Sequence, residues 1–277
     1  MSQQLGTKAD EYREAGVIHL AGALDAGTLA RLQEIYEATL ATPSPSSISF
    51  YPETGTTFTQ DLGNTAHWAQ WAEAIRASCI PDILASLWGA EDVWFYYEQV
   101  FLKEGGRTRR TPWHQDSSYL PVTGEQIANV WISFDQVSRT DGLEFVRGSH
   151  RGPMYSPSAF DAADDTIPID PSSPLPRLPD IEAAREQWDI VSWAVEPGDI
   201  IVFHIGLLHG GAATQPGGRR RTVALRCFGE DARLEPRPSS APPATDGPEL
   251  VQIHGQIEPG ERLADHGAFP RLRGSEQ

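Results

Sequence analysis

The chain has 277 residues, of which 22 are lysine or arginine and 38 are aspartate or glutamate, for a formal net charge of −16. This acidic excess argues against nucleic acid and anionic membrane surfaces as partners, and the length is enough to bury an ample core. With only two cysteines, Cys79 and Cys227, a disulfide framework is excluded and a reducing compartment is favoured.

The first segment, MSQQLGTKADEYREAGV, is polar and charged, so we expect no secretory signal peptide. No apolar run reaches the ~18 residues of a membrane span. We therefore expect a cytoplasmic protein that binds neither membrane nor nucleic acid. The oligomeric state is left open by the sequence.

The N-terminal part is expected to be largely helical. Residues 16–22, GVIHLAG, are typical of a short strand, and residues 24–41 of a helix that Asp25 caps. A second helical region is expected at about 68–87, with a break at Pro81 because proline lacks the amide donor that a helix needs. Helical spacing in the first helix is kept by Leu29, Leu32, Ile35, Tyr36 and Leu40.

From Val93 onward, short apolar segments alternate with turn signals such as Asp-Gly and Pro-Gly. Many short strands with such punctuation predict an all-β sandwich or barrel, and the long helices of a parallel α/β sheet are missing. The expected strands are VWFYYEQVFL, NVWISFDQV, LEFVRGSH, DIVSWAV, DIIVFHI and TVALRCF.

Residues 155–179 interrupt this pattern with a stretch rich in proline, serine and aspartate. Loops of this length inside a domain are uncommon and are often functional. We interpret the stretch as a lid-like insertion, with a disordered surface loop as the alternative.

Two strong metal-ligand types, His114 and Asp116, lie one residue apart in the segment PWHQDSSY. In a strand, residues i and i+2 project from the same face, so both side chains could reach one ion while Gln115 turns away. A non-haem Fe(II) site needs two histidines and one carboxylate on one side of the ion, with the other side open. Alone, a His-x-Asp triplet is more often a surface or hydrogen-bonding pair, so a third ligand must be sought.

The segment PGDIIVFHIGLLHGG offers two candidates for that third ligand, His204 and His209. His209 stands at the expected end of the strand, beside two glycines that leave room for a bound molecule. An odd number of residues separates the two histidines, so an unbroken strand turns His204 to the opposite face, although Gly206 could break the alternation. We choose His209 and interpret His204 as structural.

Three arginines precede the last expected strand. They could form a basic run exposed to solvent. Alternatively, one face of this strand binds a dicarboxylate, because arginine holds a carboxylate through two parallel hydrogen bonds. One face would carry Arg220, Thr222, Ala224 and Arg226, and the other, apolar face would carry Val223, Leu225 and Cys227.

In combination, these motifs resemble the phytanoyl-CoA dioxygenase family of Fe(II)- and 2-oxoglutarate-dependent oxygenases. The stretches that carry the resemblance are HQD, NVWISFDQVSRTDGLEFVRGSHRG and PGDIIVFHIGLLHGG…RRR, and the likeness runs from EAGVIHLAGAL to GAFPRL. The resemblance implies a mainly β fold, a double-stranded β-helix (jelly-roll, cupin-like) core with flanking N-terminal α-helices. It implies a single domain over 1–277, with a helical part at about 1–90, the core at about 91–235 and the lid-like insertion at about 155–179.

The resemblance also implies roles for particular residues. Fe(II) would be held by His114, Asp116 and His209. The arginine that binds 2-oxoglutarate, eleven residues after the distal histidine, falls on Arg220, in agreement with the strand alternation. His150 of the DGLEFVRGSH signature is interpreted as structural. The further cosubstrate contacts implied are Gln115, Trp131, Gln99 and Gly211, the last where serine is frequent in the family, so that a hydroxyl is lost.

The implied reaction consumes O2 and 2-oxoglutarate, hydroxylates an unactivated C–H bond of a small-molecule metabolite, and releases succinate and CO2. Desaturation, epoxidation or cyclisation by the same fold stay open, whereas halogenases carry a small residue where this chain has Asp116. A non-enzymatic jelly-roll protein that binds a small molecule or metal is the other alternative. A structural metal site usually has four protein ligands, however, and a zinc hydrolase would not need Arg220.

The substrate is constrained only by charge. The run KEGGRTRR at 103–110 is the only basic run besides 219–221, so we favour a small metabolite over a polyanionic CoA thioester. Arg226, six residues beyond Arg220, would lie about 20 Å from it. Its expected partner is either an acid at Glu230 or Asp231, or a carboxylate or phosphate of the substrate.

Overall fold

A computed structural model describes residues 2–50, 56–105, 110–161, 163–211, 213–214, 218–237 and 248–274. Its strands form two sheets and one separate pair. The large sheet contains β1 (Val17–Leu20), β2 (Ile48–Phe50), β3 (Thr57–Leu62), β4 (Val93–Glu104), β7 (Ile127–Ser133), β10 (Ile200–His204), β12 (Arg219–Phe228) and β14 (Arg271–Arg273). The small sheet contains β5 (Thr111–His114), β8 (Leu143–Val146), β9 (Ile190–Ser192) and β11 (His209–Gly211), and a separate pair joins β6 (Val122–Thr123) to β13 (Arg233–Leu234).

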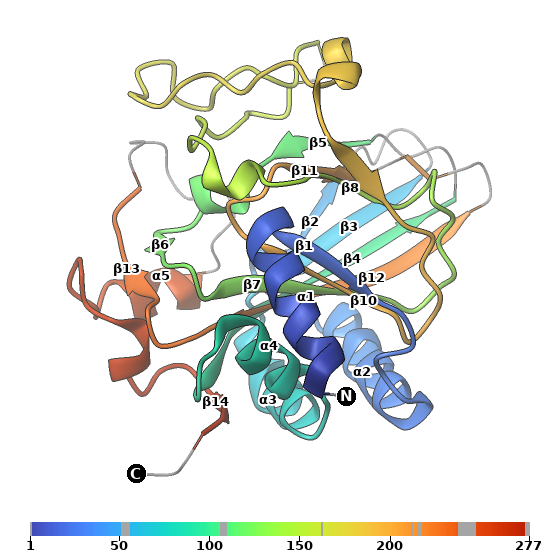
Figure 1. Ribbon diagram of the computed structural model, residues 1–277, viewed down its shortest axis with the longest axis vertical. Coiled ribbons are helices and arrows are strands. Elements are labelled where there is room, and N and C mark those ends of the chain that lie inside the picture. The colour runs from blue at the N-terminus through green and yellow to red at the C-terminus, as the bar shows by residue number, and fades with distance from the viewer. Residues whose placement is uncertain are drawn as a thin grey trace.

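The two sheets are antiparallel and face each other, which confirms the predicted mainly β, jelly-roll class (Figure 1). Strand order is β1-β10-β7-β12-β4-β3-β2 in the large sheet, with β14 beside β4, and β5-β11-β8-β9 in the small one. The chain passes from β10 in the large sheet to β11 in the small sheet and back to β12 in the large sheet, so residues far apart in sequence meet between the sheets. A buried cluster that includes Trp131, Phe145, Phe203 and Ala224 fills this space.

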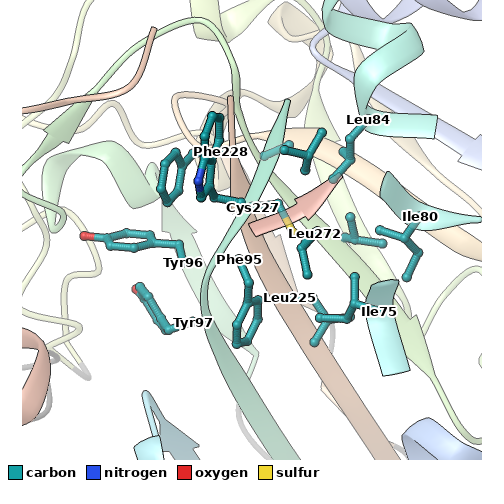
Figure 2. Close-up of a cluster of buried hydrophobic side chains, with 14 of the residues drawn as sticks. Ile75, Ile80, Leu84, Phe95, Tyr96, Tyr97, Leu225, Cys227, Phe228 and Leu272 are labelled. Carbon is teal, nitrogen blue, oxygen red and sulfur yellow. The ribbon is translucent and has the colours of Figure 1, made fainter. Parts of the chain in front are cut away.

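Helices cover the outer face of the large sheet (Figure 1). They are α1 (Ser2–Ala15), α2 (Ala26–Ala41), α3 (Trp68–Arg76) and α4 (Ile80–Trp88), whereas α5 (Pro248–His254) lies to one side, by β13 and β6. Figure 2 shows Ile75 of α3 and Leu84 of α4 packing toward Phe95, Leu225 and Cys227 of β4 and β12. Burial of this apolar surface holds the helices against the sheet. None of the described helices has the length and apolar character that a membrane crossing requires.

The helix predicted after residue 24 is confirmed. The carboxylate of Asp25 accepts a hydrogen bond from the amide of Thr28 at 2.9 Å, as an N-cap does, and Leu32 and Ile35 are buried. The first helix, α1, lies within the part expected to be helical, at about 1–90, but no helix was assigned to these residues, because their sequence is polar over most of its length. It nevertheless buries Tyr12 in the core.

The expected break at Pro81 is placed differently in the structure. The chain leaves helical order after Arg76 and resumes at Ile80, so Pro81 lies in the first turn of α4. A first-turn proline costs nothing, since its missing N–H would have no partner within the helix. The proline therefore begins a helix rather than ending one.

The segment at 197–211, expected as one strand, forms two strands in different sheets. β10 ends at His204, and after a turn β11 begins at His209. The argument from unbroken alternation between these two histidines was therefore wrong. His204 lies in the large sheet and His209 in the small sheet, because the chain crosses between the sheets after β10.

The expected lid runs across the end of the sandwich, above β5, β11 and β8 (Figure 1, yellow). Among its described residues, 155–161 and 163–179, the only strand-like pairing is the bridge between Ser158 and Pro168. An ion pair between Arg177 and Asp164 closes this segment on itself.

Candidate metal centre

Three side chains that could ligate a metal converge between the sheets. His114 is the last residue of β5, Asp116 the first of the short 3-10 helix η3 (Asp116–Ser118), and His209 the first of β11. His114 and His209 face each other as direct partners across the strand pair. One ligand atom from each residue lies within 4.8 Å of the others, and in the described ranges no second cluster of this kind occurs.

Asp116 does not lie in a strand, in contrast to the expectation. β5 ends at His114, but Gln115 keeps an extended backbone with φ −115° and ψ 132°. The alternation of side chains therefore continues for one residue, and Asp116 returns to the side of His114. Nε2 of His114 lies 3.5 Å from Oδ1 of Asp116.

Hydrogen bonds orient both imidazoles. Nδ1 of His114 lies 2.8 Å from the carbonyl oxygen of Pro112, and Nδ1 of His209 lies 3.0 Å from that of Leu207. A carbonyl oxygen only accepts, so each Nδ1 donates and each Nε2 is left with its lone pair for a metal. Burial, with the neighbouring His114, lowers the pKa of His209 to about 4, so its ring is neutral at physiological pH.

The carboxylate of Asp116 is engaged at one oxygen. Oδ2 accepts hydrogen bonds from Nδ2 of Asn129 at 2.7 Å and from Nη2 of Arg226 at 2.9 Å. Burial alone would raise the pKa of Asp116, but Arg226 and the two histidines hold this pKa well below its usual range. The group is therefore an ionised carboxylate with Oδ1 facing His114.

Arg226 pairs with Asp116. The sequence analysis had expected Glu230, Asp231 or an anionic group of the substrate as its partner, and this expectation is corrected. Nη1 of Arg226 donates to Oε1 of Gln99 at 2.8 Å. Glu230 and Asp231, the acids considered from the sequence, accept from backbone amides instead.

Arg220 lies on the inner face of β12, as the alternation predicted. It is 6% exposed and donates to the carbonyl oxygen of Asp141. Arg219 and Arg221 turn outward, where both pair with Asp135. Burial lowers the pKa of Arg220 to about 10, so its guanidinium still carries a positive charge at neutral pH.

Lys103 is a second buried basic residue beside Arg220, and the sequence analysis missed it. It is the direct cross-strand partner of Arg220, is 2% exposed, and lies 4.1 Å from the ring centre of Phe58. Burial and the charge of Arg220 lower the pKa of Lys103 well below its usual value. A lysine directly after the apolar run of β4 was the available signal, but the sequence analysis considered it only as part of the basic run at 103–110.

Thr111 lies between Lys103 and Gly211, the residue predicted to contact the cosubstrate. Nζ of Lys103 donates to Oγ1 of Thr111 at 3.1 Å, and Thr111 pairs with Gly211 across β5 and β11. A Cβ atom at Gly211 would lie 3.3 Å from that oxygen. A hydroxyl therefore stands close to where a serine at 211 would place one.

The remaining predicted cosubstrate contacts are all buried or partly buried. Trp131, on β7, is the cross-strand partner of Ala224 in the cluster between the sheets. Gln99 is bonded to Arg226, as described above. The amide of Gln115 donates to the carbonyl of Gly206 at 2.8 Å, and its oxygen accepts from the amide of Tyr155 at 2.9 Å. Gln115 thus ties the start of the lid to the loop before His209.

The two histidines interpreted as structural make only backbone hydrogen bonds. His204 accepts from the amide of Gly206 at 3.0 Å, and His150 lies 3.3 Å from the carbonyl of Arg13. Their rings pack with centres 5.4 Å apart, away from the candidate metal centre.

Two aromatic rings lie against His114 on the lid side. The ring centre of Phe160 is 5.5 Å from that of His114, and the ring centre of Tyr119 is 6.1 Å away. Tyr119 also donates to the carbonyl of Ser158 in the lid at 2.9 Å. Phe160 has φ 53° and is the one non-glycine residue with positive φ among those described, so its backbone is strained where the lid touches the centre.

Two histidines and one carboxylate held by a β-sandwich, with no fourth protein ligand in the described cluster, define the class of non-haem iron centres. A family model described as phytanoyl-CoA dioxygenase matches residues 12–222. The chain belongs to the phytanoyl-CoA dioxygenase family, as the sequence motifs predicted.

Curated relatives are similar over part of their length. A probable phytanoyl-CoA dioxygenase of Caenorhabditis elegans is 26% identical over 129 residues, which are 46% of this chain and 39% of that protein. The peroxisomal phytanoyl-CoA dioxygenase of Homo sapiens is 26% identical over 129 residues, 46% of this chain and 36% of that protein. The match thus spans less than half of each relative.

Solved structures share the fold over nearly the whole chain. The α-ketoglutarate-dependent epimerase SnoN from nogalamycin biosynthesis has a TM-score of 0.74 and 20% identity, covering 100% of this chain and 99% of its own. The carbocyclase SnoK from nogalamycin biosynthesis has a TM-score of 0.67 and 19% identity, covering 95% and 94%. EctD from S. alaskensis, solved with 2-oxoglutarate and 5-hydroxyectoine, has a TM-score of 0.63 and 21% identity, covering 87% and 83%. SnoN was also solved with Fe3+ and α-ketoglutarate, the metal and cosubstrate that the sequence predicted for this chain.

Proposed function

We propose that the protein is an Fe(II)- and 2-oxoglutarate-dependent dioxygenase that hydroxylates an unactivated C–H bond of a small-molecule metabolite. The observation that carries this proposal is the convergence of His114, Asp116 and His209, together with the burial of Arg220 and Lys103 as direct partners on β12 and β4. When bound, the iron supplies the oxidative chemistry with O2, coupled to conversion of 2-oxoglutarate into succinate and CO2.

The residues of the chain would hold Fe(II) from one side. Nε2 of His114, Nε2 of His209 and Oδ1 of Asp116 are the atoms left available by the hydrogen bonds at Nδ1 and Oδ2. The neutral state of His209 and the ionised state of Asp116 are the protonation states that a metal requires. The lid side remains for cosubstrate, O2 and substrate.

Arg220 and Lys103 would bind the distal carboxylate of 2-oxoglutarate. Burial beside Arg220 disfavours the charged form of Lys103, and a carboxylate between the two side chains would favour that form while accepting charge-assisted hydrogen bonds. The hydroxyl of Thr111, the backbone at Gly211 and the indole of Trp131 are the other groups proposed to contact the cosubstrate.

The charge of the site mouth favours a small metabolite over a CoA thioester. In the basic run at 103–110, Lys103 is buried inside the sandwich, and Arg110 is paired with Glu144 at 2.6 Å and with Glu182 at 3.3 Å. Residues 106–109 lie outside the described residues. The lid carries four aspartates and one arginine, so it would repel a polyanion. Rings at Phe160 and Tyr119 favour an apolar or ring-bearing substrate beside the metal.

Hydroxylation competes with other outcomes of the same chemistry. Structures of an epimerase, a carbocyclase and EctD resemble this chain to similar extents, so the shared fold does not select among desaturation, epoxidation and cyclisation. The ionised carboxylate of Asp116 occupies the position where a halogenase has a small residue. A structural metal site usually has four protein ligands, whereas three converge in the cluster among the described residues. The cytoplasmic location and the single-domain division also stay predictions.

The test is a screen of candidate metabolites with Fe(II), O2 and 2-oxoglutarate, scored by release of succinate and by the mass of the product. Hydroxylation predicts a product heavier by one oxygen atom, whereas desaturation or cyclisation loses two hydrogens and epimerisation leaves the mass unchanged. Asp116→Ala serves as the inactive control. If no candidate releases succinate above that control, the proposed enzymatic function fails.

A further inference from the structure

The carboxylate of Asp116 accepts hydrogen bonds from two donors on neighbouring strands. Nη2 of Arg226 on β12 and Nδ2 of Asn129 on β7 lie 2.9 Å and 2.7 Å from the same oxygen, Oδ2. Arg226 and Asn129 are direct cross-strand partners, so the sheet register fixes the two donors side by side. Their common target leaves Oδ1 as the oxygen that faces His114 at 3.5 Å.

Further contacts hold these donors in place. Arg226 donates to Gln99 of β4 at 2.8 Å, and its guanidinium lies 4.7 Å from the ring centre of Tyr97 on the same strand. The side chain of Arg226 is 6% exposed, and Asn129 is fully buried. Residues from three adjacent strands of the large sheet thus surround the carboxylate of Asp116, which is itself the first residue of η3, after β5.

We propose that Arg226 and Asn129 are positioning residues that restrict Asp116 to metal coordination through Oδ1 alone. A carboxylate can bind a metal through one or both of its oxygens. Two hydrogen bonds at Oδ2, one of them charge-assisted, hold that oxygen away from the metal. The coordination position that a two-oxygen carboxylate would fill then stays open for the cosubstrate. This inference rests on the proposed function and adds a role for Arg226 within it.

Metal affinity alone would not isolate this role. A guanidinium close to a metal dication repels it, so removing Arg226 would tighten metal binding by electrostatics. Losing the orientation of Asp116 would act in the opposite direction. A separate carboxylate avoids this ambiguity, because both the charge and the hydrogen bonds of Arg226 favour an anion at the position of Asp116.

The experiment therefore removes the Asp116 side chain and supplies formate. In Asp116→Ala, formate should tighten Co(II) binding by about tenfold or more, since charged hydrogen bonds of this kind are worth at least that factor. In Asp116→Ala combined with Arg226→Met, the effect of formate should nearly vanish. The matched control combines Asp116→Ala with Arg221→Met, on the opposite face of β12 and paired with Asp135, and it should keep the full formate effect.

A second readout needs no metal. Asp116→Ala leaves Arg226 buried without its carboxylate, which is destabilising, so formate should raise the melting temperature of the metal-free single variant and not of the double variant. Equal formate effects with and without Arg226, or no formate effect in the single variant, would overturn the inference. A wild-type chain that binds no Co(II) would overturn the proposed function instead, and the melting temperatures would still decide the role of Arg226.

Discussion

Replacing Arg220 by methionine should weaken 2-oxoglutarate binding by a predictable amount. Truncating one partner of a buried, hydrogen-bonded charge pair costs about 2–5 kcal/mol. Lys103, the buried cross-strand partner of Arg220, still offers an amino group to the carboxylate at the same place. We therefore expect the lower part of that range, about 2–3 kcal/mol, or about 30- to 150-fold in affinity. Methionine retains the apolar bulk of the side chain and leaves no cavity of the kind that alanine would.

The assay is calorimetric titration of 2-oxoglutarate into the Mn(II)-loaded protein, with pyruvate as a ligand that lacks the distal carboxylate. Arg220→Met should weaken 2-oxoglutarate binding and leave pyruvate binding nearly unchanged. Arg219→Met and Arg221→Met are the matched controls, because both arginines pair with Asp135 on the outer face of β12. Weaker 2-oxoglutarate binding in these control variants, with unchanged binding in Arg220→Met, would refute the assignment of Arg220 to the cosubstrate.

Three further outcomes are expected. Asp116→Ala should abolish coupled turnover, and a variant with full turnover would show that the ligand set is wrong. Proteolysis within 155–179 should be slower with Fe(II), 2-oxoglutarate and substrate than without them, and equal cleavage would make that segment a passive loop. The free energy of unfolding of the metal-free protein should fall as pH drops from 6.5 toward 4, measured by denaturant titration, because the pKa of His209 is lowered from 6.5 to about 4 and only the unfolded chain takes up the proton in that window. Bound metal should counteract that loss, and a flat profile would contradict the buried neutral ring.

Local patterns predicted much of the fold because they depend on neighbouring residues. The alternation in β12 placed Arg220 on the inner face and Leu225 in the core, and the spacing of His114 and Asp116 brought them together. The N-cap at Asp25 was predicted for the same reason. Such features follow from backbone periodicity, which the sequence displays directly.

Contacts between distant strands could not be predicted in the same way. The pairing of Arg226 with Asp116 and Asn129 depends on the register between β12 and β7 and on the turn after β5. The burial of Lys103 opposite Arg220 likewise depends on the pairing of β4 with β12. A lysine buried beside an arginine contradicts the usual rule for core residues, and a bound dicarboxylate is the proposed reason for the exception.

The most direct test of the central claim is the visible absorption of the protein mixed with Fe(II) and 2-oxoglutarate under anaerobic conditions. Chelation of Fe(II) by the carboxylate and keto oxygens of 2-oxoglutarate gives a charge-transfer band that neither component gives alone. The proposed centre predicts this band in the wild-type protein, its loss in His209→Ala, and a shift to higher 2-oxoglutarate concentrations in Arg220→Met. A folded wild-type protein that gives no band at saturating Fe(II) and 2-oxoglutarate would contradict the account.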